Sequence, residues 1–354
     1  MNPSDATPQT PLVSVVVVNY NCKKWFDRFF PSLKAQTIFD RLEIIMVDNT
    51  STDGSAEMCR DEMAKWPNGV YLATGGNFGY GGGCNRGAAI AKGKYLFFLN
   101  PDVWLEPNCL EELVKQTEAS KRHITSALML DYDSDNVQLQ GGNGFDFFGV
   151  LTVPPPGEIL VEPFAVAAFF FMTQELFQKI GGFDEEFFLF AEEMDLTWRA
   201  WISGENALLI RDAKLHHQGA SSGDRKMENR TSETKRFYAN RSQLLALLKS
   251  AHNLLLILAF NQLMLITAEA VVGAILARRF SFARWSLFKP LADCWRLRGH
   301  ILAERRRIRG FRKRGDLWIL RHFFQFQFGR WMDIKRLLQS GVKIDKAWQT
   351  GGKK

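Results

Sequence analysis

The chain has 354 residues, of which 46% are hydrophobic and 23% are charged, so it can bury one large core together with a smaller appendage. Its five cysteines show no CxxC spacing, which argues against a disulfide framework or a zinc site and is typical of a reducing compartment. The net charge of +7 is unevenly distributed: residues 246–354 carry 22 Lys and Arg against 6 Asp and Glu (+16), and residues 1–245 carry 23 against 32 (−9).

Residues 1–10 are polar and are predicted to be disordered, with no apolar stretch that would indicate a signal peptide. After them, strand-like and helix-like segments alternate along the chain. The run LVSVVVV is continuous and β-branched, as expected for a strand buried on both faces of a parallel sheet. The predicted strands are 12–18, 42–47, 70–72 and 95–100, and the predicted helices are 23–36, 55–65 and one that ends at 88–92.

The middle of the chain continues this pattern with less regular segments. Residues 74–87 (TGGNFGYGGGCNRG) are predicted to form a Gly-rich loop, which is neither a P-loop nor a Rossmann fingerprint. The apolar run 161–172 is predicted as an edge or mixed strand, 192–202 as a helix, and 208–215 as a strand. The alternation predicts an α/β fold in which helices flank a mostly parallel sheet.

Acidic residues follow three of the apolar runs: Asp48, then Asp102, then the cluster in AEEMDL. Ligands of open α/β sheets bind at the carboxyl edge, where such residues lie. Asp102 could ligate a divalent cation that bridges a diphosphate, or it could cap the helix that contains residues 110–114. Glu192 and Glu193 are adjacent and point in different directions, so at most one should face a reacting atom. The alternative is an acidic first turn favoured by the helix dipole.

His216 and His217 end the predicted strand 208–215. Either could ligate a metal ion through a neutral imidazole, but the residues alone name no partner for it.

Six segments, taken in order, carry a family resemblance: PLVSVVVVNYN, VDNTSTDGS, GGNFGYGGGCNRG, FLNPDV, GGFDEEFFLFAEEMDLTWR and LHHQGASS. Over residues 11–245 the chain resembles the family-2 inverting glycosyltransferases of the GT-A fold, and within them bacterial rhamnosyltransferase-like members. The resemblance implies a nucleotide-sugar donor (dTDP-, UDP- or GDP-linked), a Mg²⁺ or Mn²⁺ ion, and a lipid-linked or polysaccharide acceptor. It makes dTDP-rhamnose the first candidate donor.

The resemblance also assigns roles to individual residues. Glu193 stands where the family usually places the catalytic Asp of a Glu-Asp pair, and Glu192 and Asp195 are expected to support the helix start. Asp102 and His216 would bind the metal ion, with His216 chosen over His217 from its offset to the following Gly/Ser segment. The residues expected to bind the donor are Asn19, Tyr20, Asp48, Asn77, Asn85 and Asp102.

The basic region 246–354 is predicted to be helical and membrane-associating. Residues 254–277 are apolar and long enough to span a bilayer, but they contain Asn261, Gln262 and Glu269. A single span would also place the +16 tail outside, against the positive-inside tendency. The alternatives are an interfacial or re-entrant helix beside anionic lipid and a buried helical pair. We expect the cytoplasmic face of a membrane and no nucleic-acid partner, because residues 1–245 do not suit a nucleic-acid enzyme.

Two other functions compete with glycosyl transfer. A sugar-nucleotide nucleotidyltransferase would need a basic Gly-rich signature after its first strand, where this chain has NYN. A non-catalytic scaffold in a polysaccharide assembly complex would not need to retain the four residues Asp48, Asp102, Glu193 and His216.

Overall fold

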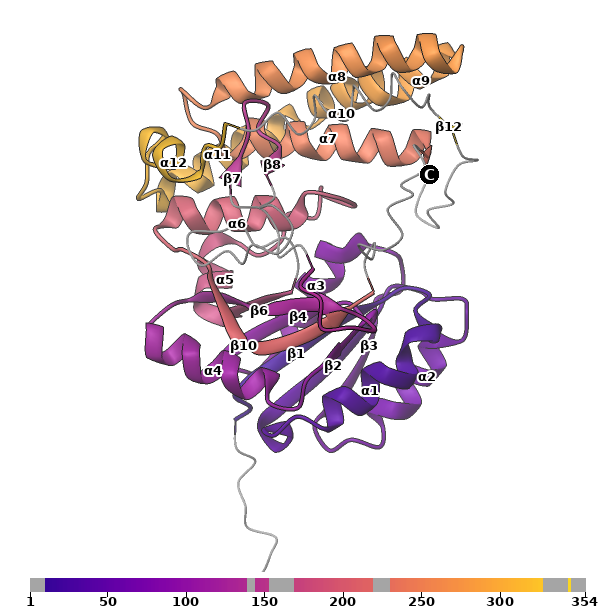
Figure 1. The fold of residues 1–354 in the computed structure, drawn as a ribbon, viewed down its shortest axis with the longest axis vertical. Helices are drawn as coiled ribbons and strands as arrows, with labels where there is room; N and C mark the ends of the chain where they lie inside the picture. The colour runs from indigo at the N-terminus through magenta and orange to yellow at the C-terminus, as the bar shows by residue number, and fades with distance from the viewer. Residues whose placement is uncertain (1–9, 139–143, 153–168, 219–229, 327–342, 345–354) are drawn as a thin grey trace, which may run out of the picture.

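The computed structural model describes residues 10–138, 144–152, 169–218, 230–326 and 343–344. The predicted disorder of residues 1–10 and most of the predicted strand 161–172 therefore lie outside the described residues. Within the described part, a sheet with helices on both faces is overlaid at one end by a layer of helices (Figure 1).

Eight strands form the central sheet, in the order β3-β2-β1-β4-β9-β6-β10-β5. All pairings are parallel except those made by β9 and β5, which confirms the predicted mostly parallel sheet. Strand β9 lies between β4 and β6, so it is a mixed strand inside the sheet and not an edge strand. The strands are β1 (Val13–Asn19), β2 (Leu42–Asp48), β3 (Gly69–Ala73), β4 (Tyr95–Leu99), β5 (Val103–Leu105), β6 (Ile124–Asp131), β9 (Phe170–Thr173) and β10 (Leu208–His217).

Alternation along β1 supplies a separate core on each face of the sheet. Val13, Val15 and Val17 pack into one core, and Val16 and Val18 pack into the other. The first core is covered by α1 (Phe26–Lys34), which follows a 3-10 turn at Lys23–Trp25, by α2 (Ser55–Met63) and by α4 (Cys109–Ser120). The second is covered by α3 (Gly79–Ile90), α5 (Gln174–Ile180) and α6 (Glu192–Ser203).

The predicted Gly-rich loop is wrong in its second half, because α3 begins at Gly79 and includes the three consecutive glycines. Helix α3 lies so close to β1 that side chains would not fit between them. A Cβ at Gly83 would come 2.8 Å from a methyl carbon of Val18, and one at Gly87 would come 2.4 Å from Val16. Close packing therefore overrides the low helix propensity of glycine here.

The C-terminal helical layer consists of six α-helices and one π-helical turn over residues 233–323. It packs against α6, and both share a core that includes Trp198 and Trp201 of α6 and Ile301 and Ile308. Residue 246, the predicted domain boundary, lies inside α7, so no break in secondary structure occurs there. The elements are α7 (Glu233–Ser250), α8 (Leu256–Ala277), α9 (Phe280–Ala283), the π-helix Arg284–Phe288, α10 (Lys289–Arg296), α11 (Arg298–Phe311) and α12 (Asp316–Phe323).

Much of the basic charge of this layer points inward and binds carbonyl groups. Arg305 donates to the carbonyls of Leu248 and Ala251, and Arg314 donates to the carbonyl of Gly204 at the C-terminal end of α6. Helix C-termini carry unpaired carbonyls and partial negative charge, which these arginines satisfy. Arg314 thereby ties the layer to α6, and Arg305 ties α11 to α7 within the layer. The remaining short elements are a 3-10 turn at Phe39–Arg41 and the strand pairs β7 (Gly144–Phe145) with β8 (Leu151–Thr152) and β11 (Arg230–Thr231) with β12 (Lys343–Ile344).

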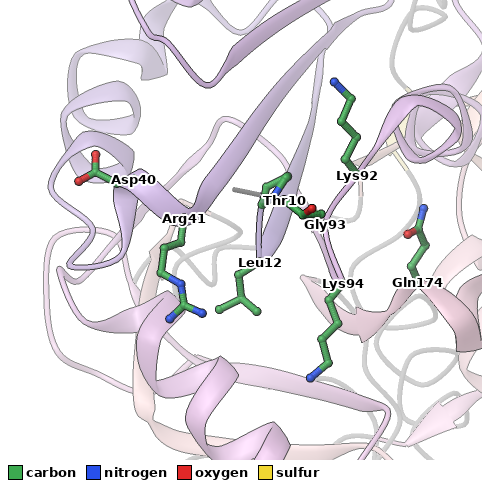
Figure 2. A pocket seen from close by; sticks show the side chains of 9 residues that line it. Thr10, Leu12, Asp40, Arg41, Lys92, Gly93, Lys94 and Gln174 are labelled. Carbon is green, nitrogen blue, oxygen red and sulfur yellow. The ribbon is translucent and has the colours of Figure 1, made fainter. Parts of the chain in front are cut away.

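A hollow lies at the edge of the sheet where its parallel strands begin. It is lined by Leu12, Arg41, Lys92, Lys94 and Gln174, among others (Figure 2). It lies where β1, β2 and β4 begin. Because ligands of such sheets bind where the parallel strands end, we look for the functional site at the other edge.

Candidate active site

Asn19 and Asp48 end the neighbouring strands β1 and β2 and bind each other. The Asn19 amide donates to Asp48 Oδ1 at 2.7 Å, and Asp48 Oδ2 accepts the backbone N–H groups of Thr50 and Ser51 at 3.1 Å. Both side chains are buried. Asp48 thus holds the turn after β2 from beneath the site, and its contact with a base or ribose stays a prediction.

The other predicted donor-binding residues lie around this edge and differ in how far hydrogen bonds within the protein already engage their side chains. Tyr20 follows β1 and is partly exposed. Asn77 accepts the Gly79 N–H at 2.9 Å and lines a hollow between the start of α3 and α7. Asn85 is committed elsewhere, because its amide donates to the Phe183 carbonyl at 2.8 Å and accepts the Phe183 N–H at 2.9 Å. Asn85 therefore positions the segment that leads to α6.

Asp102 follows β4 and faces His217 at the end of β10. His217 Nε2 lies 3.5 Å from Asp102 Oδ2, and the buried Oδ1 of Asp102 makes no hydrogen bond to any described residue. On its other side, His217 Nδ1 lies 3.2 Å from Gln138 Oε1. A proton on Nδ1 satisfies that contact and leaves the lone pair of Nε2 directed at Asp102. A carboxylate and an oriented imidazole are suitable ligands for a divalent cation.

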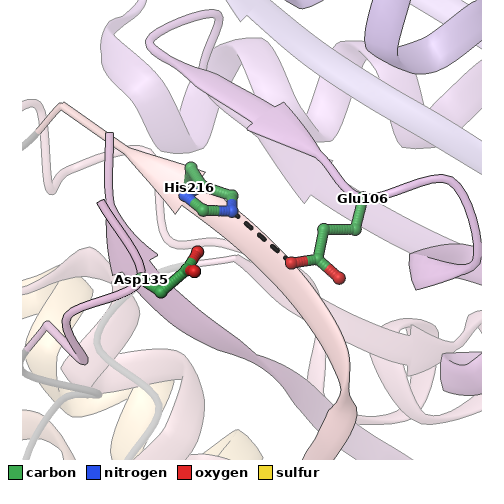
Figure 3. Close-up of side chains that lie close together, drawn as sticks. All are labelled: Glu106, Asp135 and His216. Atoms are coloured by element: carbon green, nitrogen blue, oxygen red, sulfur yellow. Dashed lines mark ion pairs between the residues drawn. The ribbon is translucent and has the colours of Figure 1, made fainter. Parts of the chain in front are cut away.

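The structure places His217, and not the predicted His216, beside Asp102, and a metal-binding role of His216 stays a prediction. Adjacent residues of a strand point to opposite sides, so His216 is turned away from Asp102. Its ring stacks on Trp104 at 3.7 Å, and its Nδ1 lies 2.9 Å from the Asp131 carbonyl. His216 instead gathers with Glu106 and Asp135, their ligand atoms lying within 4.8 Å of one another (Figure 3).

Glu192 and Glu193 begin α6 directly after two residues in the left-handed region, Phe190 (φ 64°) and Ala191 (φ 63°). Such conformations are strained for residues with a side chain, and they concentrate at functional sites. Burial raises the pKa of Glu192 to about 7 and, together with the nearby charge of Glu192, raises the pKa of Glu193 well above its ordinary value. Burial therefore favours the neutral forms of both carboxyls, and a carboxylate with a raised pKa is a stronger base once it is ionised, as suits an acid–base group.

No described Lys, Arg or His side chain lies close enough to stabilise the negative charges of Glu192 and Glu193. Its neighbours on α3 are Tyr80 and Cys84, and burial raises the pKa of both, so both stay neutral. The buried Oε2 of Glu192 also has no hydrogen-bond partner among the residues that the structure describes. The expectation that Glu192 only supports the helix start is therefore incomplete.

Asp195 does support the helix, as predicted. It is fully buried and accepts hydrogen bonds from Arg199 at 2.6 and 2.9 Å and from the Lys249 ammonium at 2.9 Å. Lys249 also donates to Asp184 at 2.5 Å, and Asp184 contacts His300 at 2.8 Å. The hydrogen bond that His300 donates to the Asp184 carboxylate raises the pKa of His300. This buried ionic network ties α6 to α7 and α11.

Comparison with known proteins gives one family. The sequence profile described as "Glycosyl transferase family 2" matches residues 14–189. Relatives include the putative glycosyltransferase EpsH of Bacillus subtilis (34% identical, covering 30% of each chain) and the hexosyltransferase Agl10 of Haloferax volcanii (24% identical, 53% of this chain and 61% of that protein). The N-acetylglucosaminyl-diphospho-decaprenol L-rhamnosyltransferase of Mycobacterium tuberculosis is 26% identical over 60% of this chain and 78% of its own.

The matches to EpsH and Agl10 cover less than two thirds of those proteins' lengths. Among solved structures, GalNAc-T7 with UDP, GalNAc and Mn²⁺ superimposes with a TM-score of 0.54 at 16% identity, over 68% of this chain and 48% of that one. TarS of S. aureus gives a TM-score of 0.50 at 15% identity, over 85% and 54%. These likenesses show that the fold is of the GT-A type.

Proposed function

The chain belongs to glycosyl transferase family 2, and from that premise we propose that it moves a hexose from a nucleotide-sugar donor to a lipid-linked or cell-surface glycan. The similarity to a mycobacterial rhamnosyltransferase supports a rhamnosyl donor and a lipid-diphosphate-linked acceptor as the first candidates. The similarity to Agl10, named a hexosyltransferase of glycan biosynthesis, supports the broader class.

The observation that carries this proposal is the carboxylate pair at the start of α6. Glu193 is the less buried of the two, and we assign it the role of general base. It accepts the proton of the acceptor hydroxyl while that oxygen attacks the anomeric carbon. The bond from this carbon to the nucleoside diphosphate breaks, and the leaving oxygen keeps the electron pair. Attack opposite the leaving group inverts the anomeric configuration in one step.

Asp102 and His217 are the residues that would hold a Mg²⁺ or Mn²⁺ ion. Two observations fit that role: the buried Oδ1 of Asp102 has no hydrogen-bond partner within the described ranges, and Gln138 orients His217. A cation bound there supplies positive charge to the leaving diphosphate. The buried ionic network around Asp195 and Lys249 keeps the start of α6, and with it Glu193, in a fixed position.

Nucleotide-sugar binding tests this proposal. Thermal unfolding would be followed with dTDP-, UDP- and GDP-sugars, each with and without Mn²⁺. We expect one donor class to stabilise the protein in a Mn²⁺-dependent way, by about 2.7 kcal/mol when the donor is at 100 times its Kd. Asp102→Asn should abolish the Mn²⁺ dependence.

The control variant is Asp133→Asn, which alters an exposed carboxylate paired with Arg28 and should leave donor binding unchanged. Failure of all three donor classes to stabilise the wild-type protein would contradict the proposed function. Equal Mn²⁺-dependent stabilisation of wild type and Asp102→Asn would contradict the metal assignment.

A further inference from the structure

Helix α8 presents a continuous apolar stripe to the outside of the molecule. The stripe, which we call the α8 face, consists of Ile257, Phe260, Met264, Val271 and Ile275, which are 52%, 57%, 56%, 53% and 68% exposed. Their spacing of 3, 4, 7 and 4 residues places all five along one side of the helix. The opposite side, with Leu258, Leu265, Ile266 and Ala270, is buried in the helical layer.

The polar residues of α8 point the other way, into the protein. Asn261 is buried and donates to the Phe147 carbonyl at 2.9 Å. Gln262 is fully buried, and Glu269 is buried beside Arg236, with 3.4 Å between the charged groups. A surface helix of a water-exposed protein has the reverse arrangement, with its polar residues outside. The α8 face is therefore suited to contact with an apolar environment and not with water.

The end of α8 adds aromatic and basic groups next to this stripe. Phe280 is 75% exposed and packs on Phe288, which is 54% exposed, with 6.3 Å between the ring centroids. Arg278 and Arg279, between Phe280 and the end of α8, are exposed as well. Exposed aromatic rings beside arginines are typical of a segment at an anionic lipid surface.

The position of α8 decides between spanning a bilayer and lying on it. Its segment Leu256–Leu276 is long and apolar enough to span. However, α8 packs along α7 and α9 and forms the layer farthest from the sheet (Figure 1). To span, it would have to leave α7 and carry Asn261, Gln262 and Glu269 into hydrocarbon without their present surroundings, which is costly.

We propose that the α8 face docks on an anionic membrane surface, with α8 parallel to the membrane plane and its apolar stripe inserted at the headgroup–acyl boundary. The arginines at its C-terminal end then contact anionic headgroups. In this orientation α6, which carries the catalytic carboxylates, lies between the sheet and the membrane-facing layer. The docking face does not depend on the proposed chemistry, because it rests on the exposure pattern of α8 and of the aromatic and basic residues that follow it.

Vesicle flotation of the full chain tests the docking face. The triple variant Phe260→Ser, Met264→Ser and Ile275→Ser should bind vesicles made of equal parts phosphatidylglycerol and phosphatidylcholine about 100-fold more weakly than wild type. Ile90→Ser, which removes a 41%-exposed side chain on α3, is the matched control and should bind like wild type. Circular dichroism and thermal unfolding confirm that the triple variant is folded.

Four results would overturn the inference. The triple variant binds as well as wild type, or wild type binds pure phosphatidylcholine as strongly as the anionic vesicles. Alternatively, native membranes retain the protein after alkaline carbonate washing, as a span requires. Light scattering without lipid should give a monomer; a dimer that the triple variant abolishes would assign the α8 face to a second copy of the chain.

Discussion

Replacement of Lys249 by Met tests whether the buried ionic network fastens the C-terminal helical layer to α6. The Lys249 ammonium is fully buried, 2.5 Å from Asp184 and 2.9 Å from Asp195. Methionine keeps most of the aliphatic stem and removes only the charge, so the two carboxylates remain buried with one cation fewer. Breaking a buried pair in this way costs about 3–5 kcal/mol. We therefore expect the free energy of unfolding to fall by about that amount.

The assay is urea unfolding at neutral pH, followed by far-UV circular dichroism and by tryptophan fluorescence, to which Trp198 and Trp201 of α6 contribute among the ten tryptophans of the chain. The matched control is Lys65→Met, which removes an ammonium that is 66% exposed and 2.8 Å from Glu62. Exposed pairs contribute about 0–1 kcal/mol, so this variant should be close to wild type. A loss for Lys249→Met no larger than that of Lys65→Met would refute the reasoning.

Three further predictions follow from the site. His217→Ala should weaken the Mn²⁺ dependence of donor binding by about 10- to 100-fold, while His216→Ala, one residue away on the other side of β10, should leave it unchanged; titration of Mn²⁺ against donor binding decides this. Glu192→Gln should lower the raised pKa of Glu193 by removing a neighbouring negative charge, so the acidic limb of the kcat/KM–pH profile should move to lower pH; an unmoved limb would contradict the coupling. His300 has a raised pKa, so the stability it contributes is complete below its ordinary pKa of 6.5 and is lost as pH rises through the raised value. The difference in free energy of unfolding between wild type and His300→Gln should therefore shrink from acidic to alkaline pH. A difference that stays constant with pH would refute this prediction.

Local patterns predict much of this fold because they report burial directly. The β-branched runs that become β1 and β2 need two apolar faces, and only a strand inside a layered sheet offers both. Local patterns do not predict helix α3, because glycine disfavours helices. The glycines are needed there because Gly83 and Gly87 contact β1. That contact joins residues far apart in the sequence, and no local pattern reveals it.

The candidate site is predicted only in part, for similar reasons. Asp102 follows a predicted strand, and Glu193 lies in the first turn of a predicted helix, so local patterns could place both. The choice between His216 and His217 depends on the register of β10, which shifts between Ile210 and Lys214 through an irregularity that the sequence does not mark. A one-residue change of register exchanges the two sides of a strand, so the offset within a motif could not decide it.

The basic tail shows a further limit of composition. Its net charge predicted an anionic partner, but residues such as Arg305 and Arg314 are engaged with carbonyls of the protein itself. Only the three-dimensional structure separates these from the exposed Arg278 and Arg279 at the end of α8. The polar residues of α8 were an objection to a membrane span, and because they are buried in the protein they do not oppose contact of the exposed side of α8 with a membrane surface.

The most direct test of the central claim is the rate of sugar transfer by Glu193→Gln once a donor has been identified. Glutamine keeps the shape of the side chain but cannot accept the proton of the acceptor hydroxyl. We predict that kcat falls by about 10²- to 10⁴-fold while the Kd of the donor is unchanged, and that Glu193→Asp retains a measurable fraction of the activity. Transfer by Glu193→Gln at the wild-type rate, or a selective loss of activity in Glu192→Gln instead, would contradict the assignment of Glu193 as the catalytic base.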